Sequence, residues 1–179
     1  MDVVQTRILT ADEIGEAVRL LARGEVVAFP TETVYGLGAN ALDPNAVGAI
    51  FKAKGRPQDN PLIVHLCDAS QAKDYVQAIS SQARLLMDRF WPGPLTLVLR
   101  KAGLIPPVVT AGLGTVALRV PDHPLALELV RRTGFPLAAP SANLSGRPSP
   151  TRAEHVLNDL NGKIPAILDG GETGWGLES

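Results

Sequence analysis

Three cations at alternate positions, Lys52, Lys54 and Arg56, are the residues of this sequence that most clearly suggest chemistry. They follow an expected helix, and Gly55 and Pro57 favour a chain that has left the helical conformation. In an extended segment, alternate side chains point to the same side. Ammonium and guanidinium groups gathered in this way would bind phosphate or carboxylate oxygens, so the spacing predicts an anion site. The alternative is that these cations only complement the dipole at the helix end.

A second polar segment, 141–146, follows an apolar run and reads Ser-Ala-Asn-Leu-Ser-Gly. Its small side chains let a ligand approach the backbone, and free N–H groups in a turn can hold phosphate oxygens. The same residue types are also ordinary turn formers, so the segment alone does not decide between the two. The sequence contains no GxxxxGK[ST] and no GxGxxG after an expected strand. Neither of these common nucleotide-binding signatures therefore applies.

The elements that must position these groups alternate along the chain, which predicts one α/β domain. Apolar periodicity and capping residues predict helices, the first of them opening with a Thr10–Glu13 capping box and stopping at Gly24. The further expected helices are 44–52, 69–78, 81–90, 123–132 and 151–160, the last with a second capping box at Thr151 and Glu154. The expected strands are 25–29, 62–66, 95–100, 116–120, 135–139 and 166–168, and the polar loops are 31–40, 52–60, 110–115 and 141–150.

Composition excludes several classes of protein. The 179 residues are 45% hydrophobic and 4% aromatic, with a formal net charge of −1, which argues against disorder, a base-stacking platform and a DNA-coating protein. A single cysteine, Cys67, allows no internal disulfide. The charged start does not resemble a secretory signal, and no apolar run approaches the roughly 20 residues of a membrane span. We therefore expect a soluble cytoplasmic protein with no membrane partner.

The histidines give weaker signals. His65 stands at the end of an expected buried strand, where an imidazole is more often part of the core than a ligand contact. No His, Cys and carboxylate group has the spacing of a metal site, so no metal is expected on protein side chains. GxSxG is absent as well, although residue types alone do not exclude a Ser–His–Asp hydrolase.

Four blocks occurring in order resemble the YrdC-like threonylcarbamoyl-AMP synthases. They are 29–38 (FPTETVYGLG), 52–62 (KAKGRPQDNPL), 91–96 (WPGPLT) and 140–146 (PSANLSG). The resemblance implies a twisted, open, mixed α/β sheet flanked by helices, with a concave, positively charged cavity. It implies that L-threonine, bicarbonate and ATP form threonylcarbamoyl-AMP and pyrophosphate. Downstream proteins would transfer the threonylcarbamoyl group to the adenosine beside the tRNA anticodon, and direct contact with tRNA is left open.

Carried over by position, the resemblance also implies the roles of individual residues. Thr33, His65, Arg119, Ala139 and Ser179 would contact threonine, and Lys52, Lys54, Arg56, Asn60, Thr115, Ser141, Asn143 and Ser149 would bind ATP. Lys54 and Arg56 would be catalytic through charge stabilisation, without a covalent nucleophile, and Mg²⁺ would accompany the triphosphate of ATP.

The resemblance spans residues 1–179 as one YrdC-like synthase domain. Family members usually continue beyond Gly-Leu-Glu-Ser, so we expect a domain truncated at its C-terminal end. Two other functions remain open from the residues alone. One is a non-catalytic RNA-binding or ribosome-associated module that uses the same cavity, and the other is a hydrolase of a carbamoylated or nucleotide substrate.

Overall fold

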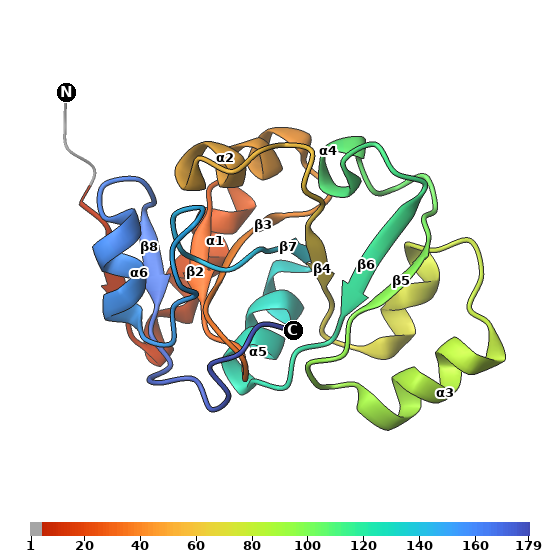
Figure 1. Cartoon of the computed structure of the whole chain (residues 1–179). Helices are drawn as coiled ribbons and strands as arrows, with labels where there is room; N and C mark the ends of the chain where they lie inside the picture. Colours follow the sequence, from red (N-terminus) through yellow and green to blue (C-terminus); the bar gives the residue numbers. More distant parts are fainter. Residues whose placement is uncertain (1–4) are drawn as a thin grey trace.

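A computed structural model describes residues 5–179, so residues 1–4 of the expected domain lie outside it, and the strands of the described part join in one mixed sheet (Figure 1). These strands are β1 (Arg7–Leu9), β2 (Val27–Phe29), β3 (Gly36–Asn40), β4 (Ile63–His65), β5 (Leu97–Arg100), β6 (Thr115–Arg119), β7 (Leu137–Ala138) and β8 (Ala166–Leu168). Their order is β1-β8-β2-β3-β7-β4-β6-β5. Strand β8 pairs in parallel with β1 and β2, and β4 with β6, whereas the other neighbours are antiparallel. The predicted fold class is confirmed.

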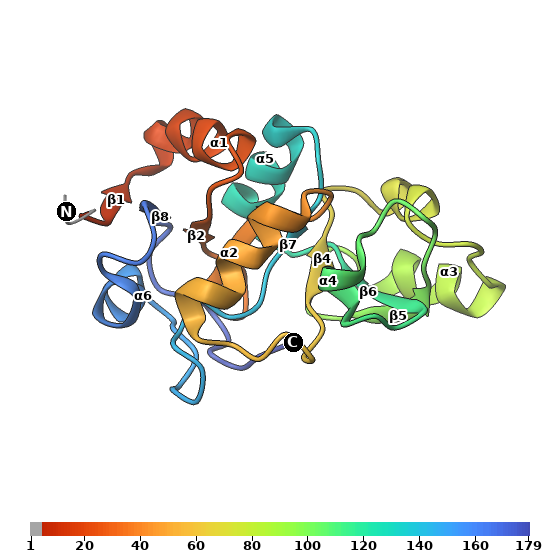
Figure 2. The same ribbon diagram turned by 90° about the horizontal axis from the view of Figure 1, so that it is seen from above.

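Helices cover both faces of this sheet. They are α1 (Ile14–Ala22), α2 (Pro44–Lys54), α3 (Ser81–Phe90), α4 (Pro107–Thr110), α5 (Pro124–Thr133) and α6 (Ala153–Leu160), with 3-10 turns η1 (Ala11–Glu13) and η2 (Ala69–Asp74). Alternate residues of β2 divide between two cores: Val27 and Phe29 pack with α1 and α5, and Ala28 packs with α2 and α6. Figure 2 shows α1 and α5 on one side and α6 with the C-terminus on the other.

One strand, β3, lies where the sequence predicted only a loop. Its residues are small because the ring of Phe29 lies across them: a Cβ on Gly38 would stand 2.7 Å from Cε1 of Phe29. Because this segment lacks bulky β-forming residues, its sequence does not predict a strand, although β3 is buried between β2 and β7. The predicted loop at 31–40 is therefore correct only up to residue 35.

Helix α2 is longer than predicted, and this changes the direction of the three cations. It runs to Lys54 and ends at Gly55, whose φ of 61° is the left-handed conformation that glycine adopts readily. Lys52 and Lys54 are thus helical, and residues two apart on a helix do not share a face. The prediction that all three cations point the same way from an extended segment is wrong.

Other boundaries differ in smaller ways. The Glu13 carboxylate accepts the N–H of Thr10 at 2.9 Å, as the capping box predicted. Helix α6, in contrast, begins after Arg152, and Thr151 and Glu154 form no such box. Residues 69–74 form the 3-10 turn η2 instead of a helix over 69–78, and β1 and α4 were not predicted. Among residues 5–179, no helix combines the length and apolar character that a bilayer crossing needs.

Candidate functional site

A cavity of about 130 Å³ opens where several strand ends and loops meet. Its wall comes from the β2–β3 loop, the segment before β4, the ends of β4 and β6, the residues after β7, and the C-terminal segment. The lining residues are Thr31, Thr33, Val34, Gly36, Arg56, Pro61, Leu62, Ile63, His65, Arg119, Ala139, Pro140, Ser141, Glu178 and Ser179. All five positions expected to contact threonine are among them.

The register of two parallel strands brings His65 and Arg119 together. These residues are paired neighbours at the ends of β4 and β6, so their side chains share one face of the sheet. Nδ1 of His65 lies 3.2 Å from the Ile63 carbonyl oxygen, and its ring meets Phe29 edge-on, with centroids 5.9 Å apart. Burial lowers the pKa of His65 to about 4. The imidazole is therefore neutral at pH 7, and it is both a core residue and part of the cavity wall.

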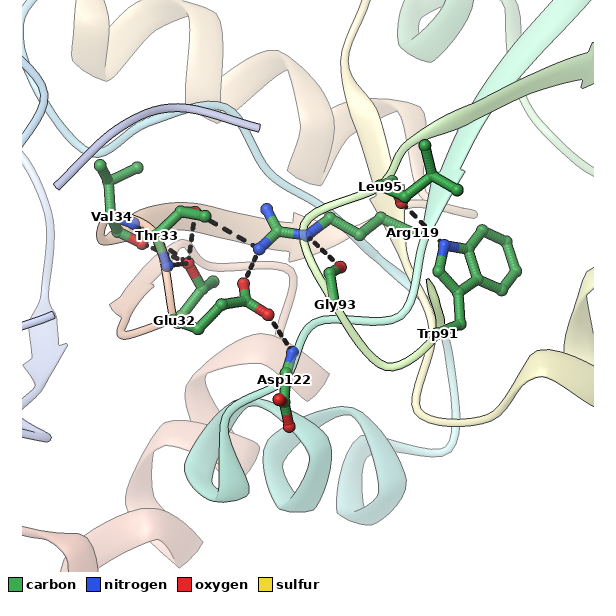
Figure 3. A network of polar contacts seen from close by, with 9 residues as sticks. Glu32, Thr33, Val34, Trp91, Gly93, Leu95, Arg119 and Asp122 are labelled. Carbon is green, nitrogen blue, oxygen red and sulfur yellow. Dashed lines mark hydrogen bonds and ion pairs between the residues drawn. The ribbon is translucent and has the colours of Figure 1, made fainter. Parts of the chain in front are cut away.

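Arg119 is the buried cation of the site, with 2% of its surface exposed. Its Nε donates to the Gly93 carbonyl oxygen at 3.1 Å, and its Nη2 donates to the Thr33 hydroxyl at 3.3 Å and forms an ion pair with Glu32 (Figure 3). Burial lowers the pKa of Arg119 to about 10, which still leaves the guanidinium charged at pH 7. A buried, fixed guanidinium suits the carboxylate of a small ligand.

Thr33 is held by a tight turn after β2. The Thr31 hydroxyl accepts the N–H groups of Thr33 and Val34, both at 3.2 Å, and lies 3.0 Å from the Thr33 hydroxyl. Hydroxyl residues commonly stabilise turns in this way. The turn presents a short polar side chain to the cavity from a rigid backbone.

The C-terminal segment reaches the cavity because the same turn binds it. The N–H of Trp175 donates to the Glu32 carbonyl oxygen at 3.1 Å, and the N–H of Gly176 donates to the Thr33 carbonyl oxygen at 3.0 Å. Glu178 and Ser179 follow and line the wall. Figure 1 shows this end of the chain in front of α5 and beside β4.

On the other side of the cavity, Arg56 is the one residue of the predicted cation cluster that lines the wall. Its Nη2 donates to the Pro61 carbonyl oxygen at 3.2 Å, and its buried Nε has no partner within residues 5–179. Burial lowers the pKa of Arg56, and the nearby Glu178 carboxylate opposes this effect. Arg56 thus keeps donor capacity for an anion that enters the cavity.

Lys54 lies beneath the wall instead of in it, with 3% exposure. Its ammonium donates to the Ser141 carbonyl oxygen and, at 2.6 Å, to the Asn143 carbonyl oxygen. Burial, and then the charge of Arg56, lowers the pKa of Lys54 to about 8. Lys54 therefore ties the 141–143 segment to the end of α2, and Ser141 and Arg56 face one common cavity as the sequence suggested.

Lys52 lies apart from the cavity. It is exposed and shares a different hollow with Gly24, Glu25 and Lys163. Since this hollow is lined by other elements, the structure does not bring Lys52 together with Arg56.

Four further positions expected to bind ATP do not line the cavity. Asn60 is exposed, and its carbonyl oxygen lies 3.5 Å from Nη2 of Arg56. Thr115 begins β6, where it pairs with Arg100 of β5. Nδ2 of Asn143 donates to two carbonyl oxygens of its own loop, and the Ser149 hydroxyl donates to Glu178. Their roles toward ATP stay predictions.

Two glutamates of the site were missed by the sequence analysis. Glu32 stands within the FPTET block and Glu178 within Gly-Leu-Glu-Ser, but neither was assigned a role. Glu32 could have been found only by pairing it with Arg119, which is distant in the sequence. Because the cavity wall holds Arg56, Arg119 and Glu178, and Glu32 offsets Arg119, the predicted positive charge of the cavity stays a prediction.

The chain is similar to proteins of known family. The family model Sua5_yciO_yrdC, described as telomere recombination, matches residues 19–179. Threonylcarbamoyl-AMP synthase of Bacillus subtilis is 59% identical over 100% of this chain and 52% of its own length. The synthase of Pyrococcus abyssi is 58% identical over 91% and 48%. A crystal structure of P. abyssi Sua5 complexed with L-threonine has a TM-score of 0.92 at 54% identity, covering 94% of this chain and 51% of that one. The chain spans about half the length of these relatives.

Proposed function

Because the chain belongs to the Sua5/YciO/YrdC family, we propose that it forms threonylcarbamoyl-AMP from L-threonine, bicarbonate and ATP and releases pyrophosphate. It would thus be a nucleotidyltransferase. One observation carries the proposal: every position that the resemblance assigns to threonine lines one cavity, together with Arg56 and Ser141. A relative with 54% identity is a Sua5 complexed with L-threonine, which supports the same conclusion.

The proposed reaction needs positioning more than a reactive side chain. The threonine amine and bicarbonate combine with loss of water, and the resulting carbamate oxygen attacks the α-phosphorus of ATP. The bond from the α-phosphorus to the bridging oxygen breaks, and pyrophosphate leaves with that electron pair. Because no protein nucleophile takes part, the site must align the carbamate with the α-phosphate, exclude water and offset developing charge.

The two sides of the cavity divide this work. Arg119 would bind the threonine carboxylate beside Thr33 and the neutral His65. Arg56 would face the phosphates, with the backbone at Ser141 held in place by Lys54. Lys54 would therefore act on the phosphates indirectly: its ammonium group holds the 141–143 loop in the position that faces them.

Mg²⁺ would enter with the triphosphate and neutralise part of its charge. The described part of the chain has no group of three His, Cys, Asp or Glu side chains placed to hold a metal ion, and Glu178 is the carboxylate on the cavity wall. This donor set fits a metal that is bound mainly by phosphate oxygens and water. The product would pass, in the cytoplasm, to proteins that transfer the threonylcarbamoyl group to tRNA.

The test is pyrophosphate release by this 179-residue chain. We expect release that requires ATP, threonine and bicarbonate together, and a product with the mass of threonylcarbamoyl-AMP. Equal consumption of ATP without threonine would contradict the proposal and favour a nucleotide hydrolase. Binding to RNA that falls steeply with salt, with no pyrophosphate formed, would favour the RNA-binding module instead.

A further inference from the structure

We propose that Glu32 is a positioning residue of the threonine site, which orients the Arg119 guanidinium so that its free Nη1 can receive the substrate carboxylate. This inference rests on the proposed function, because it concerns the same cavity. It adds a residue that does not itself line the cavity wall.

The Glu32 carboxylate is buried: one oxygen accepts a hydrogen bond, and the other has an ion pair but no hydrogen-bond donor among residues 5–179. Its side chain is 10% exposed, and that of Arg119 is 3% exposed. One oxygen forms the ion pair with Nη2 of Arg119, and the other accepts the backbone N–H of Asp122. Asp122 lies between β6 and α5, so a backbone group of a different segment fixes the carboxylate (Figure 3).

This arrangement leaves one nitrogen of the guanidinium, Nη1, for a ligand. Nε donates to the Gly93 carbonyl oxygen, and Nη2 serves Glu32 and Thr33. Nη1 donates no hydrogen bond to any residue in the described range 5–179, and Arg119 lines the cavity (Figure 3). Since the guanidinium is planar, fixing two of its nitrogens fixes the third.

The backbone of Glu32 joins a further part of the site. Its carbonyl oxygen accepts the N–H of Trp175, and the next carbonyl, that of Thr33, accepts the N–H of Gly176. The residue thus connects the turn after β2, the end of β6 and the segment that carries Ser179. These contacts are made by the backbone, so a substitution of the Glu32 side chain leaves them in place and acts first on Arg119.

The charge of Glu32 also has a role before threonine binds. A buried guanidinium without a counter-charge destabilises a fold, and Glu32 supplies that charge in the ligand-free site. The substrate carboxylate then meets an aligned donor whose charge is already compensated. Recognition depends on the geometry of Nη1 instead of on a bare positive charge, so Glu32 affects threonine binding specifically.

The test compares Glu32→Gln with Glu172→Gln, which alters an exposed ion pair with Arg152 outside the cavity. Calorimetry would measure threonine and ATP binding, and steady-state assays would give KM for each substrate and kcat. We expect Glu32→Gln to weaken threonine binding at least about tenfold, because small misplacements of a binding group are costly, with ATP binding within about twofold. The control should match the wild type on both ligands.

The outcomes separate the two proposals. If the wild-type chain binds no threonine, the proposed function fails and this inference fails with it. If the wild type binds threonine and folded Glu32→Gln binds it equally well, only the positioning role is overturned. Equal losses for threonine and ATP would indicate a general structural defect and would also overturn it.

Two further variants cover the case in which Glu32→Gln does not fold. Glu32→Asp keeps the charge, but its shorter side chain cannot reach both Arg119 and the Asp122 N–H, so we expect a loss confined to threonine. Wild-type threonine affinity in Glu32→Asp would overturn the inference.

In a double-mutant cycle with Arg119→Gln, the variant that carries both changes should bind threonine as Arg119→Gln alone does, since Glu32 acts through Arg119. A further loss in the double variant would contradict that route.

Discussion

The two sides of the cavity are built by different means. His65 and Arg119 project from paired strand ends and are almost fully buried, so the sheet register itself sets their relation. On the opposite side, Arg56 and Ser141 come from loops that no strand pairing aligns, apart from one bridge between Gly36 and Ser141. There a buried lysine, Lys54, performs the alignment by binding the loop carbonyl groups. On the strand-built side (His65 and Arg119), the buried charge of Arg119 is compensated by Glu32. On the loop-built side (Arg56 and Ser141), Lys54 acts as a brace, because it holds the loop in place through hydrogen bonds.

The largest effect should follow from removing the charge on the strand-built side. Arg119→Gln leaves Glu32 as a buried carboxylate without its cation, which costs about 3–5 kcal/mol of unfolding free energy. Urea denaturation measures this loss, and threonine binding should weaken by more than it does in Glu32→Gln. The double variant Glu32→Gln/Arg119→Gln should recover most of the stability but none of the threonine binding. Recovery of both would contradict the role given to Arg119.

The brace on the loop-built side is tested by Lys54→Met, with Lys52→Met as its matched control. Lys54→Met leaves the carbonyl oxygens of Ser141 and Asn143 without their donor, which we expect to cost about 3 kcal/mol of stability. ATP affinity measured by calorimetry should fall more than tenfold, and threonine affinity much less. Lys52 is exposed and lies on another hollow, so its replacement should change neither. Equal effects of the two variants would contradict this difference between the lysines and would favour the single cation cluster that the sequence suggested.

The contrast between these two lysines shows what the sequence could and could not predict. Arg56 and Ser141 do line one cavity, as the cations of 52–56 and the 141–146 segment suggested, whereas the binding of an anion there stays a prediction. The directions in which the three side chains point depend on whether α2 ends at residue 52 or at residue 54. Gly55 is compatible with either end, so the sequence did not decide between them. The buried role of Lys54 arises from a loop that is remote in sequence, and no local pattern reports such a contact.

The strand-built side also has a pH signature. The pKa of His65 is about 4 in the folded chain, against 6.5 ordinarily, because burial disfavours the charged ring. Between these values the unfolded chain binds a proton that the folded chain does not, so stability falls as the pH drops from about 6.5 to 4, by roughly 2–3 kcal/mol. His65→Phe should remove most of this slope in denaturation curves and weaken threonine binding. His155→Gln, which replaces an exposed histidine, should keep the slope.

His65 also shows why a sequence pattern left two interpretations open. Its place at the end of an apolar run predicted a buried imidazole, and that is confirmed. That the same ring also lines a cavity follows from its pairing with Arg119 across β4 and β6. Strand pairing between distant segments, and the small-residue strand β3 that completes the sheet, are tertiary effects that override local propensity. The fold class could thus be predicted more fully than the arrangement of the site.

The smallest of these effects should come from the loop-built side, where Arg56 is partly exposed to solvent. Arg56→Ala removes one donor to an anion but leaves no buried charge unpaired, so stability should change little. We expect ATP to bind about tenfold more weakly, equivalent to about 1.4 kcal/mol, with threonine binding unchanged. Arg131→Ala, which removes an exposed arginine of α5, is the control and should leave ATP binding within about twofold. Arg119→Gln should show the opposite pattern, with a larger loss of threonine binding than of ATP binding. The two variants together therefore test whether the two sides of the cavity bind different ligands. Loss of threonine binding in Arg56→Ala would show that the sides are coupled and that the division of the cavity proposed here is wrong.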